Sequence, residues 1–238
     1  MSDLALLWDF DGTLATRRGM WSGCVLEVLD REVPGHGLGI ERVREALRGT
    51  FPWHRPDEGH PELRHPDAWW RSVGGAIAVA LTAAGVAGDD AARAARAVRG
   101  RYTDVTVGWR ARAGASDALA LSAASGAANV VVSNHVPELA ALVAGLGLAE
   151  NVDAVFTSAQ TGYEKPHPEA FRIALAACAD RRETWMIGDN ETADVRGAEA
   201  LGIPAVLVGA RDGDLVAAVE AILARTVTAG PVRSAPPR

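Results

Sequence analysis

Three short apolar runs in this 238-residue chain each end at polar side chains that can carry chemistry. Runs of this kind are typical of strands buried on both faces of a parallel sheet. In an open parallel sheet, ligands bind at the carboxyl ends of the strands, so polar groups far apart in the sequence can converge there. The runs, each with the residues that follow it, are Leu4–Trp8 before Asp9-Phe10-Asp11-Gly12-Thr13, Val130–Val132 before Ser133-Asn134, and Trp185–Ile187 before Gly188-Asp189-Asn190.

The acidic residues at these strand ends predict a metal site. Asp9 and Asp11 point the same way if the first strand continues through them. Close carboxylates repel each other unless a cation joins them or one of them holds a proton. Asp189 can complete an oxygen-rich group with room for water and a phosphate, and such a group suits Mg²⁺.

The remaining polar groups predict a phosphate site beside that metal. Gly12 lets the backbone approach a phosphate closely, and Ser133 and the Asn134 amide can donate hydrogen bonds to phosphate oxygens. Lys165 is the only lysine among the 24 lysine and arginine residues, which indicates a specific role for it. Its ammonium offers a compact positive charge. Together these groups would form an electrostatic clamp for phosphoryl transfer.

Helical patterns alternate with the apolar runs. Two further runs, Ala205–Val208 and the weaker Asp153–Phe156, continue the strand series. Alternation at this spacing predicts an α/β fold with a doubly wound, Rossmann-like parallel sheet. The helices predicted between the strands are Ser116–Ser125, Pro137–Leu146, Pro168–Cys178, Glu191–Leu201 and Asp212–Arg225.

The stretch from Met20 to Val107 differs, because it contains helical segments and no strong strand run. We therefore predict a small α-helical domain, residues 19–107, inserted into a core formed by residues 1–18 and 108–225. The tail, residues 226–238, contains three prolines and is expected to be disordered. The helical segments of the insert are Ile40–Arg48, Pro66–Ala84 and Asp89–Arg101.

Composition argues against several classes of protein. The formal net charge of −6 provides no basic excess to hold a nucleic acid or an anionic membrane surface. The two cysteines, Cys24 and Cys178, lie far apart and outside any metal-ligand spacing, which favours a reducing cytoplasm. No secretory signal is readable, and the longest apolar stretch, Gly74–Gly85, is too short to span a bilayer.

Four motifs in order resemble those of the haloacid dehalogenase-like (HAD) superfamily, in its phosphatase branch with a helical cap after the first motif. The resemblance covers most of the chain apart from the insert and the tail. One such motif alone is weak, whereas four in order are specific. The motifs are Asp9-Phe10-Asp11-Gly12-Thr13, Val132-Ser133-Asn134, Lys165-Pro166, and Gly188-Asp189 followed by Asp194.

The resemblance implies a role for each matching residue. Asp9 would be the nucleophile that becomes an aspartyl phosphate, and Asp11 would protonate the leaving oxygen and later deprotonate the attacking water. The Asp9 side chain, the Asp11 backbone carbonyl and Asp189 would hold Mg²⁺. Thr13 and Asp194 would support these groups from behind, with Asp194 orienting Lys165 or a metal-bound water. Gly12, Ser133, Asn134 and Lys165 would hold the phosphate, and the insert would close over the site as a mobile cap.

The expected reaction is hydrolysis of a small-molecule phosphomonoester. A sugar phosphomutase shares all four motifs and stays an alternative, as does an idle relative that only binds. A dehalogenase ranks lower, because Asp11 would have no task there. His135 could face the substrate or be an ordinary loop histidine, and among Trp53, Trp69 and Trp70 at least one is expected to pack the core of the insert. The substrate and the oligomeric state are not specified.

Overall fold

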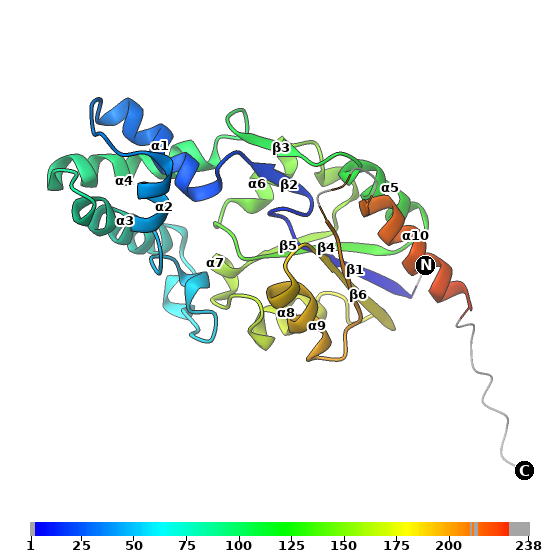
Figure 1. Cartoon of the computed structure of the whole chain (residues 1–238). Helices are drawn as coiled ribbons and strands as arrows, with labels where there is room; N and C mark the ends of the chain where they lie inside the picture. Colours follow the sequence, from blue (N-terminus) through cyan, green and yellow to red (C-terminus); the bar gives the residue numbers. More distant parts are fainter. Residues whose placement is uncertain (1–2, 210, 212–213, 229–238) are drawn as a thin grey trace, which may run out of the picture.

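A twisted sheet of five parallel strands, in the order β5-β4-β1-β6-β7, lies at the centre of the computed structural model (Figure 1). The structure describes residues 3–209, 211 and 214–228. This arrangement confirms the predicted doubly wound α/β fold, with strand ends within two residues of the expected positions. The strands are β1 (Leu4–Trp8), β4 (Ala128–Ser133), β5 (Ala154–Thr157), β6 (Glu183–Gly188) and β7 (Ala205–Leu207).

Strand β1 shows why the sheet carries helices on both faces. All five of its residues are buried, and successive side chains point to opposite faces of a strand. Leu4, Leu6 and Trp8 therefore join the core under one helical layer, while Ala5 and Leu7 join a smaller core under the other.

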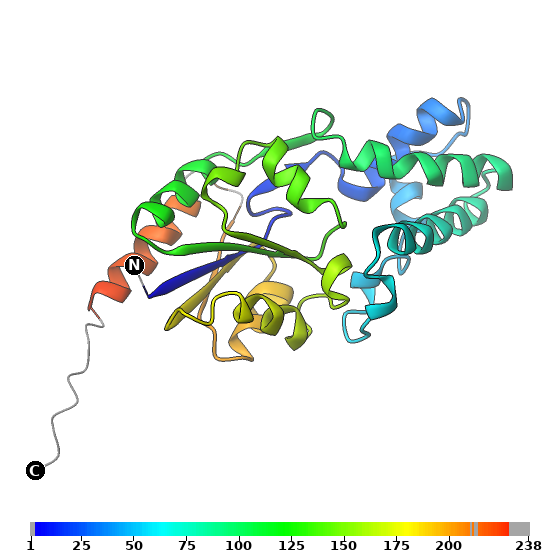
Figure 2. The ribbon, with the colours of Figure 1, turned by 180° about the vertical axis from the view of Figure 1, so that it is seen from behind.

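The two helical layers are visible on opposite sides of the sheet in Figures 1 and 2. One layer contains α5 (Ala115–Ala124), α6 (Leu139–Gly145) and α10 (Asp214–Thr228), and the other contains α8 (Pro168–Ala176) and α9 (Gly197–Glu199). Helix α6 begins two residues later than Pro137, because the backbone at residues 137 and 138 forms a turn. Two short helices, η3 (Ala149–Asn151) and α7 (Ser158–Thr161), flank β5.

The insert is helical, as expected, but its first helix is absent from the sequence prediction. Helix α1 (Met20–Glu32) buries Trp21, Cys24, Val25, Val28 and Leu29, a spacing that matches one face of a helix. The signal was therefore present, although Gly19 directly precedes the helix and Gly23 lies within its first turns. The other helices of the insert are α2 (Ile40–Ala46), α3 (Pro66–Ala83), α4 (Gly88–Thr103) and the short 3₁₀ turns η1 (Pro52–His54) and η2 (Pro61–Leu63).

A two-stranded antiparallel ribbon, formed by β2 (Ala15–Arg17) and β3 (Trp109–Ala111), carries the two connections between sheet and insert. Each strand has three residues, too few to give a periodic signal, and neither was predicted. The buried Arg17 fixes the ribbon to the insert. Its guanidinium lies 2.8 Å from a Glu27 carboxylate oxygen on α1, and Arg101 on α4 contacts the same oxygen at 2.8 Å.

Polar contacts seat the insert on the edge of the sheet. Glu138 accepts hydrogen bonds from the indole of Trp70 at 3.0 Å and from Arg99 at 3.0 Å. A second contact is buried, where His60 Nε2 lies 3.0 Å from the Glu164 Oε1 atom beside the lysine-bearing loop. These contacts hold the insert close over the carboxyl ends of the strands.

The segment after β6 differs from the single regular helix predicted over Glu191–Leu201, because it begins with a π-helical turn. Residues Glu191–Arg196 form a π-helical segment, η4, and the short α9 follows. The Asn190 side chain begins η4 by accepting hydrogen bonds from the Thr192 and Ala193 N–H groups. Single π-turns inside helices are frequent at functional sites, and here the turn carries Asp194.

The last helix runs to Thr228, three residues beyond its predicted end. Residues 226–228 of the predicted disordered tail therefore belong to α10, and residues 229–238 lie outside the described part of the chain. Within the described part, no helix has the length and apolar content needed to cross a membrane.

Gly197 controls how closely α9 approaches the loop that carries Lys165. A Cβ atom there would lie 2.9 Å from the Phe171 ring and 2.9 Å from Pro166 Cβ. We expect Gly197→Ala to lower the free energy of unfolding by about 1–3 kcal/mol, because the site is already full. Urea unfolding measures this change.

Gly75→Ala on the exposed side of α3 is the matched control, since nothing lies within 4 Å of its Cβ position. It should raise the unfolding free energy by about 0.5–1 kcal/mol through helix propensity. Equal gains in both variants would show that Gly197 is not constrained by packing.

Candidate active site

The Lys165 ammonium joins two acidic residues that lie far apart in the sequence. Its Nζ atom is 2.7 Å from Asp9 Oδ1, just beyond the end of β1, and 2.6 Å from Asp194 Oδ1 on η4. All three side chains are almost fully buried. Burial by itself would lower the pKa of Lys165, but the charges of Asp194 and Asp9 outweigh it and hold that pKa above its ordinary value.

Ser133, the last residue of β4, contacts the same carboxylate. Its hydroxyl donates a hydrogen bond to Asp9 Oδ1 at 3.0 Å. Strands β1 and β4 are paired in parallel, so their carboxyl ends meet at the edge where Ser133 and Asp9 lie. The structure thus brings Asp9, Ser133 and Lys165 together, as the sequence predicted.

Asp189 follows β6, which pairs with the other side of β1. Its carboxylate, exposed to solvent, accepts a hydrogen bond from the buried Thr13 hydroxyl at 3.2 Å. Gly12 adopts a φ of +87°, and a Cβ atom there would collide with the Asp189 carboxylate. The close approach of Asp189 therefore requires glycine at this position. The sequence analysis had assigned Gly12 to phosphate binding and did not foresee this reason.

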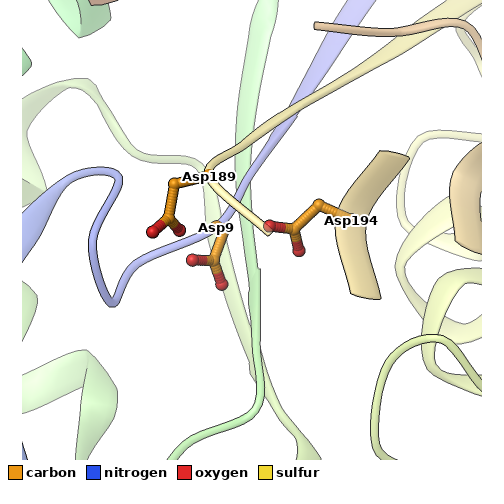
Figure 3. A group of neighbouring side chains, drawn as sticks. All are labelled: Asp9, Asp189 and Asp194. Carbon is orange, nitrogen blue, oxygen red and sulfur yellow. The ribbon is translucent and has the colours of Figure 1, made fainter. Parts of the chain in front are cut away.

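The carboxylates of Asp9, Asp189 and Asp194 face one another, and Figure 3 shows them directed into a common space. One oxygen atom from each lies within 4.8 Å of the others. The sequence analysis expected Asp194 to orient Lys165 or a metal-bound water, and its Oδ1 atom lies 2.6 Å from the Lys165 ammonium. Asp194 also accepts a hydrogen bond from the Asn190 N–H at 3.0 Å, which turns it back toward Lys165.

Asn134 has a different contact from the one predicted for its side chain. Its Oδ1 atom accepts from the Lys165 backbone N–H at 2.6 Å, and its Nδ2 atom donates to the Lys165 carbonyl at 2.9 Å. The amide therefore fixes the backbone that presents the ammonium. A direct phosphate contact by Asn134 stays a prediction.

Asp11 is the one carboxylate of the site with a buried oxygen, Oδ1, that has no hydrogen-bond partner. Burial is the main cause that raises its pKa above the ordinary range, and the charges of Asp9 and Asp189 add to it while Lys165 opposes it. A carboxyl group in this environment favours its protonated form. It can then donate that proton to a reacting oxygen.

His135 lies behind Asp11 and is not exposed to substrate, which resolves the choice that the sequence left open. Its ring packs against Phe10 and Trp109 at centroid distances of 5.2 and 5.4 Å. Its Nε2 atom is 3.7 Å from Asp11 Oδ2, and neither ring nitrogen forms a hydrogen bond. Burial lowers the pKa of His135 to about 3, so the ring is neutral.

The charges at this site fit a divalent cation. Even with Asp11 protonated, Asp9, Asp189 and Asp194 would carry three negative charges against the single positive charge of Lys165. Although Asp189 lies at the exposed side of the site, partial loss of hydration, followed by the charge of Asp194, raises its pKa. Burial is the first cause that raises the pKa of Asp194, Lys165 opposes it, and the charge of Asp9 adds to it. An oxygen-binding cation would relieve the part of these shifts that comes from carboxylate repulsion.

A cavity of about 410 Å³ opens above these carboxylates. The insert contributes Met20, Trp21, Trp53 and Pro56 to its wall. The sequence analysis raised a substrate role for the two tryptophans, Trp21 and Trp53, but not for Met20 or Pro56. Trp69, by contrast, is fully buried inside the insert, as expected for at least one tryptophan there.

The buried neutral His135 predicts a specific sensitivity to acid. The unfolded histidine binds a proton near its ordinary pKa of 6.5, whereas the folded one does not until about pH 3. Its contribution to stability is therefore complete above pH 6.5 and is lost as the pH falls. Between pH 7 and pH 5 we expect the wild type to lose about 2 kcal/mol more unfolding free energy than His135→Gln.

Urea unfolding of both proteins at the two pH values measures this difference. His36→Gln, which removes a histidine outside the site, serves as the control and should follow the wild type. Parallel losses in the wild type and His135→Gln would show that His135 is protonated in the folded protein.

Comparison with known proteins agrees with this fold. The family model for haloacid dehalogenase-like hydrolases matches residues 4–202. The mouse haloacid dehalogenase-like hydrolase domain-containing protein 3 is 30% identical over 211 residues, which cover 85% of this chain and 80% of that protein. A phosphoserine phosphatase from Thermus thermophilus is 41% identical over 85 residues, covering 35% and 34% of the two chains.

Among solved structures, one similar fold is that of the HAD hydrolase YfnB from Bacillus subtilis, which is bound to magnesium. The TM-score is 0.66 and the sequence identity 20%, and the match covers 87% of this chain and 89% of the YfnB chain. At that identity the likeness shows a shared fold alone. The match of the family model to most of the sequence goes further, because it shows common descent. This chain belongs to the haloacid dehalogenase-like hydrolase family.

Proposed function

We propose that this hydrolase is a Mg²⁺-dependent phosphatase that cleaves a small-molecule phosphomonoester through an aspartyl phosphate. The observation that carries the proposal is the contrast between two neighbouring carboxyl groups. Asp9 is held by the Ser133 hydroxyl and the Lys165 ammonium, whereas Asp11 lacks such partners and its pKa is raised by burial. The first suits a nucleophile and the second suits a proton carrier.

In the first half-reaction, a free Asp9 carboxylate oxygen attacks the phosphorus atom. A new P–O bond to Asp9 forms as the bond to the leaving oxygen breaks, and Asp11 gives its proton to that oxygen. In the second half-reaction, the water oxygen attacks the same phosphorus atom and the P–O bond to Asp9 breaks, while Asp11 takes a proton from the water. Inorganic phosphate leaves, and both aspartates return to their starting states.

The remaining side chains stabilise negative charge on the phosphoryl group. Lys165 and Ser133 already contact Asp9 and can donate to phosphate oxygens there. The Asp9 side chain, the Asp11 carbonyl and Asp189 would hold Mg²⁺, with Asp194 beside them. The cation would neutralise phosphoryl charge while the nucleophile approaches.

We further propose that the insert, residues 19–107, acts as a cap over this reaction, because four of its residues line the cavity above the carboxylates. The phosphatase named among the relatives supports phosphoester hydrolysis, although its match covers only part of the chain. Buried free thiols at Cys24 and Cys178 support a reducing cytoplasmic location. We propose no nucleic-acid or membrane partner, because the formal net charge of −6 provides no basic excess.

Asp9→Asn tests the nucleophile. With Mg²⁺ and a generic phosphomonoester, we expect no phosphate release above background and no phosphorylated protein, because the amide cannot attack phosphorus. Asp11→Asn should slow both half-reactions, since each needs the proton carried by Asp11. The measurements are phosphate release and acid-quenched phosphoenzyme in single turnover.

Asp117→Asn, an exposed carboxylate on α5, is the control and should keep wild-type activity. Near-normal turnover by Asp9→Asn would exclude Asp9 as nucleophile. An isomerised phosphate ester in place of inorganic phosphate would identify a mutase, and halide release from a 2-haloacid with no phosphatase activity would identify a dehalogenase.

Metal binding gives a separate test that needs no substrate. Added Mg²⁺ at a hundredfold excess over its dissociation constant should stabilise the wild type by about 2.7 kcal/mol. Asp189→Asn should show a smaller gain, yet without metal it should be at least as stable as the wild type, since it removes carboxylate repulsion. Thermal unfolding in EDTA and in Mg²⁺ measures both effects.

Glu199→Gln, an exposed carboxylate on α9, controls for loss of surface charge and should gain as much from Mg²⁺ as the wild type. An equal Mg²⁺ gain in Asp189→Asn would place the cation elsewhere.

A further inference from the structure

We propose that the site selects phosphomonoesters whose alcohol part carries a flat, uncharged ring, and disfavours substrates with a second anionic group. This inference deepens the proposed function and rests on it. It follows from the wall that the insert places opposite the carboxylates, which is aromatic and apolar and carries no charge.

Four insert residues, Met20, Trp21, Trp53 and Pro56, line the cavity. The cavity is also lined by three uncharged residues: Pro166, which follows Lys165, and Thr192 and Ala193 on η4. A phosphoryl group bound at Asp9 would therefore leave its alcohol part among these side chains. Rings gain most from such a wall, because they bury a large apolar area and stack on indole faces.

The charges of the cavity argue against an anionic alcohol part. Among the described residues that line it, Lys165 is the one with a cationic side chain, and that side chain is already bound by Asp9 and Asp194. A carboxylate or second phosphate would lie near four aspartates without a basic partner of its own. Like charges in a partly buried site cost several-fold or more in affinity.

Two arginines lie close by in space but on the other side of the aromatic wall. Arg44 and Arg48 line a neighbouring cavity of about 380 Å³. Met20, Trp21 and Trp53 line both cavities, so they stand between these arginines and the reaction site. The wall therefore excludes the cations that could have recognised a second anion.

The aromatic wall is fixed before substrate arrives. Trp21 stacks on Tyr102 with a centroid distance of 4.0 Å and an angle of 18°, and Trp53 stacks on Phe51 at 4.5 Å and 10°. At the start of α1, Met20 has a φ of +48°, a strained backbone for a residue with a side chain. Such strain is typical of functional sites, and both Met20 and the following Trp21 line the cavity.

Three substrates with alkyl leaving groups test the inference: benzyl phosphate, n-propyl phosphate and phosphoglycolate. We expect kcat/KM to fall by about tenfold from benzyl to propyl and again to phosphoglycolate, in line with the discrimination that apolar pockets achieve. Trp53→Leu should reduce the benzyl-to-propyl ratio to nearly one, mainly through KM for benzyl phosphate. Trp53→Phe should retain most of the ratio, because it keeps a ring that can stack.

Trp69→Phe is the matched control, since Trp69 is buried in the insert and does not line the cavity. It should leave the ratio unchanged. Phosphoglycolate turnover equal to or faster than that of benzyl phosphate would overturn the inference, as would an equal loss for all three substrates in Trp53→Leu. In both cases, turnover of propyl phosphate would leave the proposed phosphatase function intact. If the wild type hydrolysed none of the three substrates, that function would be refuted and the inference with it.

Discussion

The site depends on one buried ammonium between two carboxylates. Lys165 comes from the loop before α8, Asp9 from the end of β1 and Asp194 from η4, and the pairing at 2.7 and 2.6 Å fixes all three segments against one another. Removing the ammonium would leave two carboxylates buried side by side, which is strongly unfavourable. The Asn134 side chain supports this contact, because it forms hydrogen bonds with both the backbone N–H and the backbone carbonyl of Lys165.

Close backbone approach is the second requirement of the same edge. Gly12 admits the Asp189 carboxylate, and a Cβ atom at Gly188 would collide with the side chain of Asp194. The π-turn of η4, where a single regular helix was predicted, carries Asp194 to within 2.6 Å of the Lys165 ammonium. The carboxylates can therefore gather because two glycines and one irregular turn remove the atoms that would separate them.

Much of the fold and of the candidate site could be predicted from the sequence, and the features that could not be predicted have physical causes. The apolar runs of β1 and β6 and the polar residues that end them were sufficient to predict a parallel sheet and a shared edge, because strand polarity brings those ends together. The ribbon of β2 and β3 was not predictable, since three residues carry no periodicity. Helix α1 was missed because Gly19 and Gly23 obscured a regular burial pattern. The place of His135 among Phe10 and Trp109 depends on tertiary packing alone.

The polar contacts that seat the insert have a consequence for turnover. Glu138 with Trp70 and Arg99, and Glu164 with His60, are hydrogen-bonded pairs whose members separate if the insert lifts away. Water can replace each partner at that moment, so lifting exchanges one set of hydrogen bonds for another at a small net difference in free energy. In the proposed reaction an ester must enter and phosphate must leave in every cycle, which requires interdomain contacts that separate and form again easily. A wholly apolar interface of the same extent would be much slower to separate.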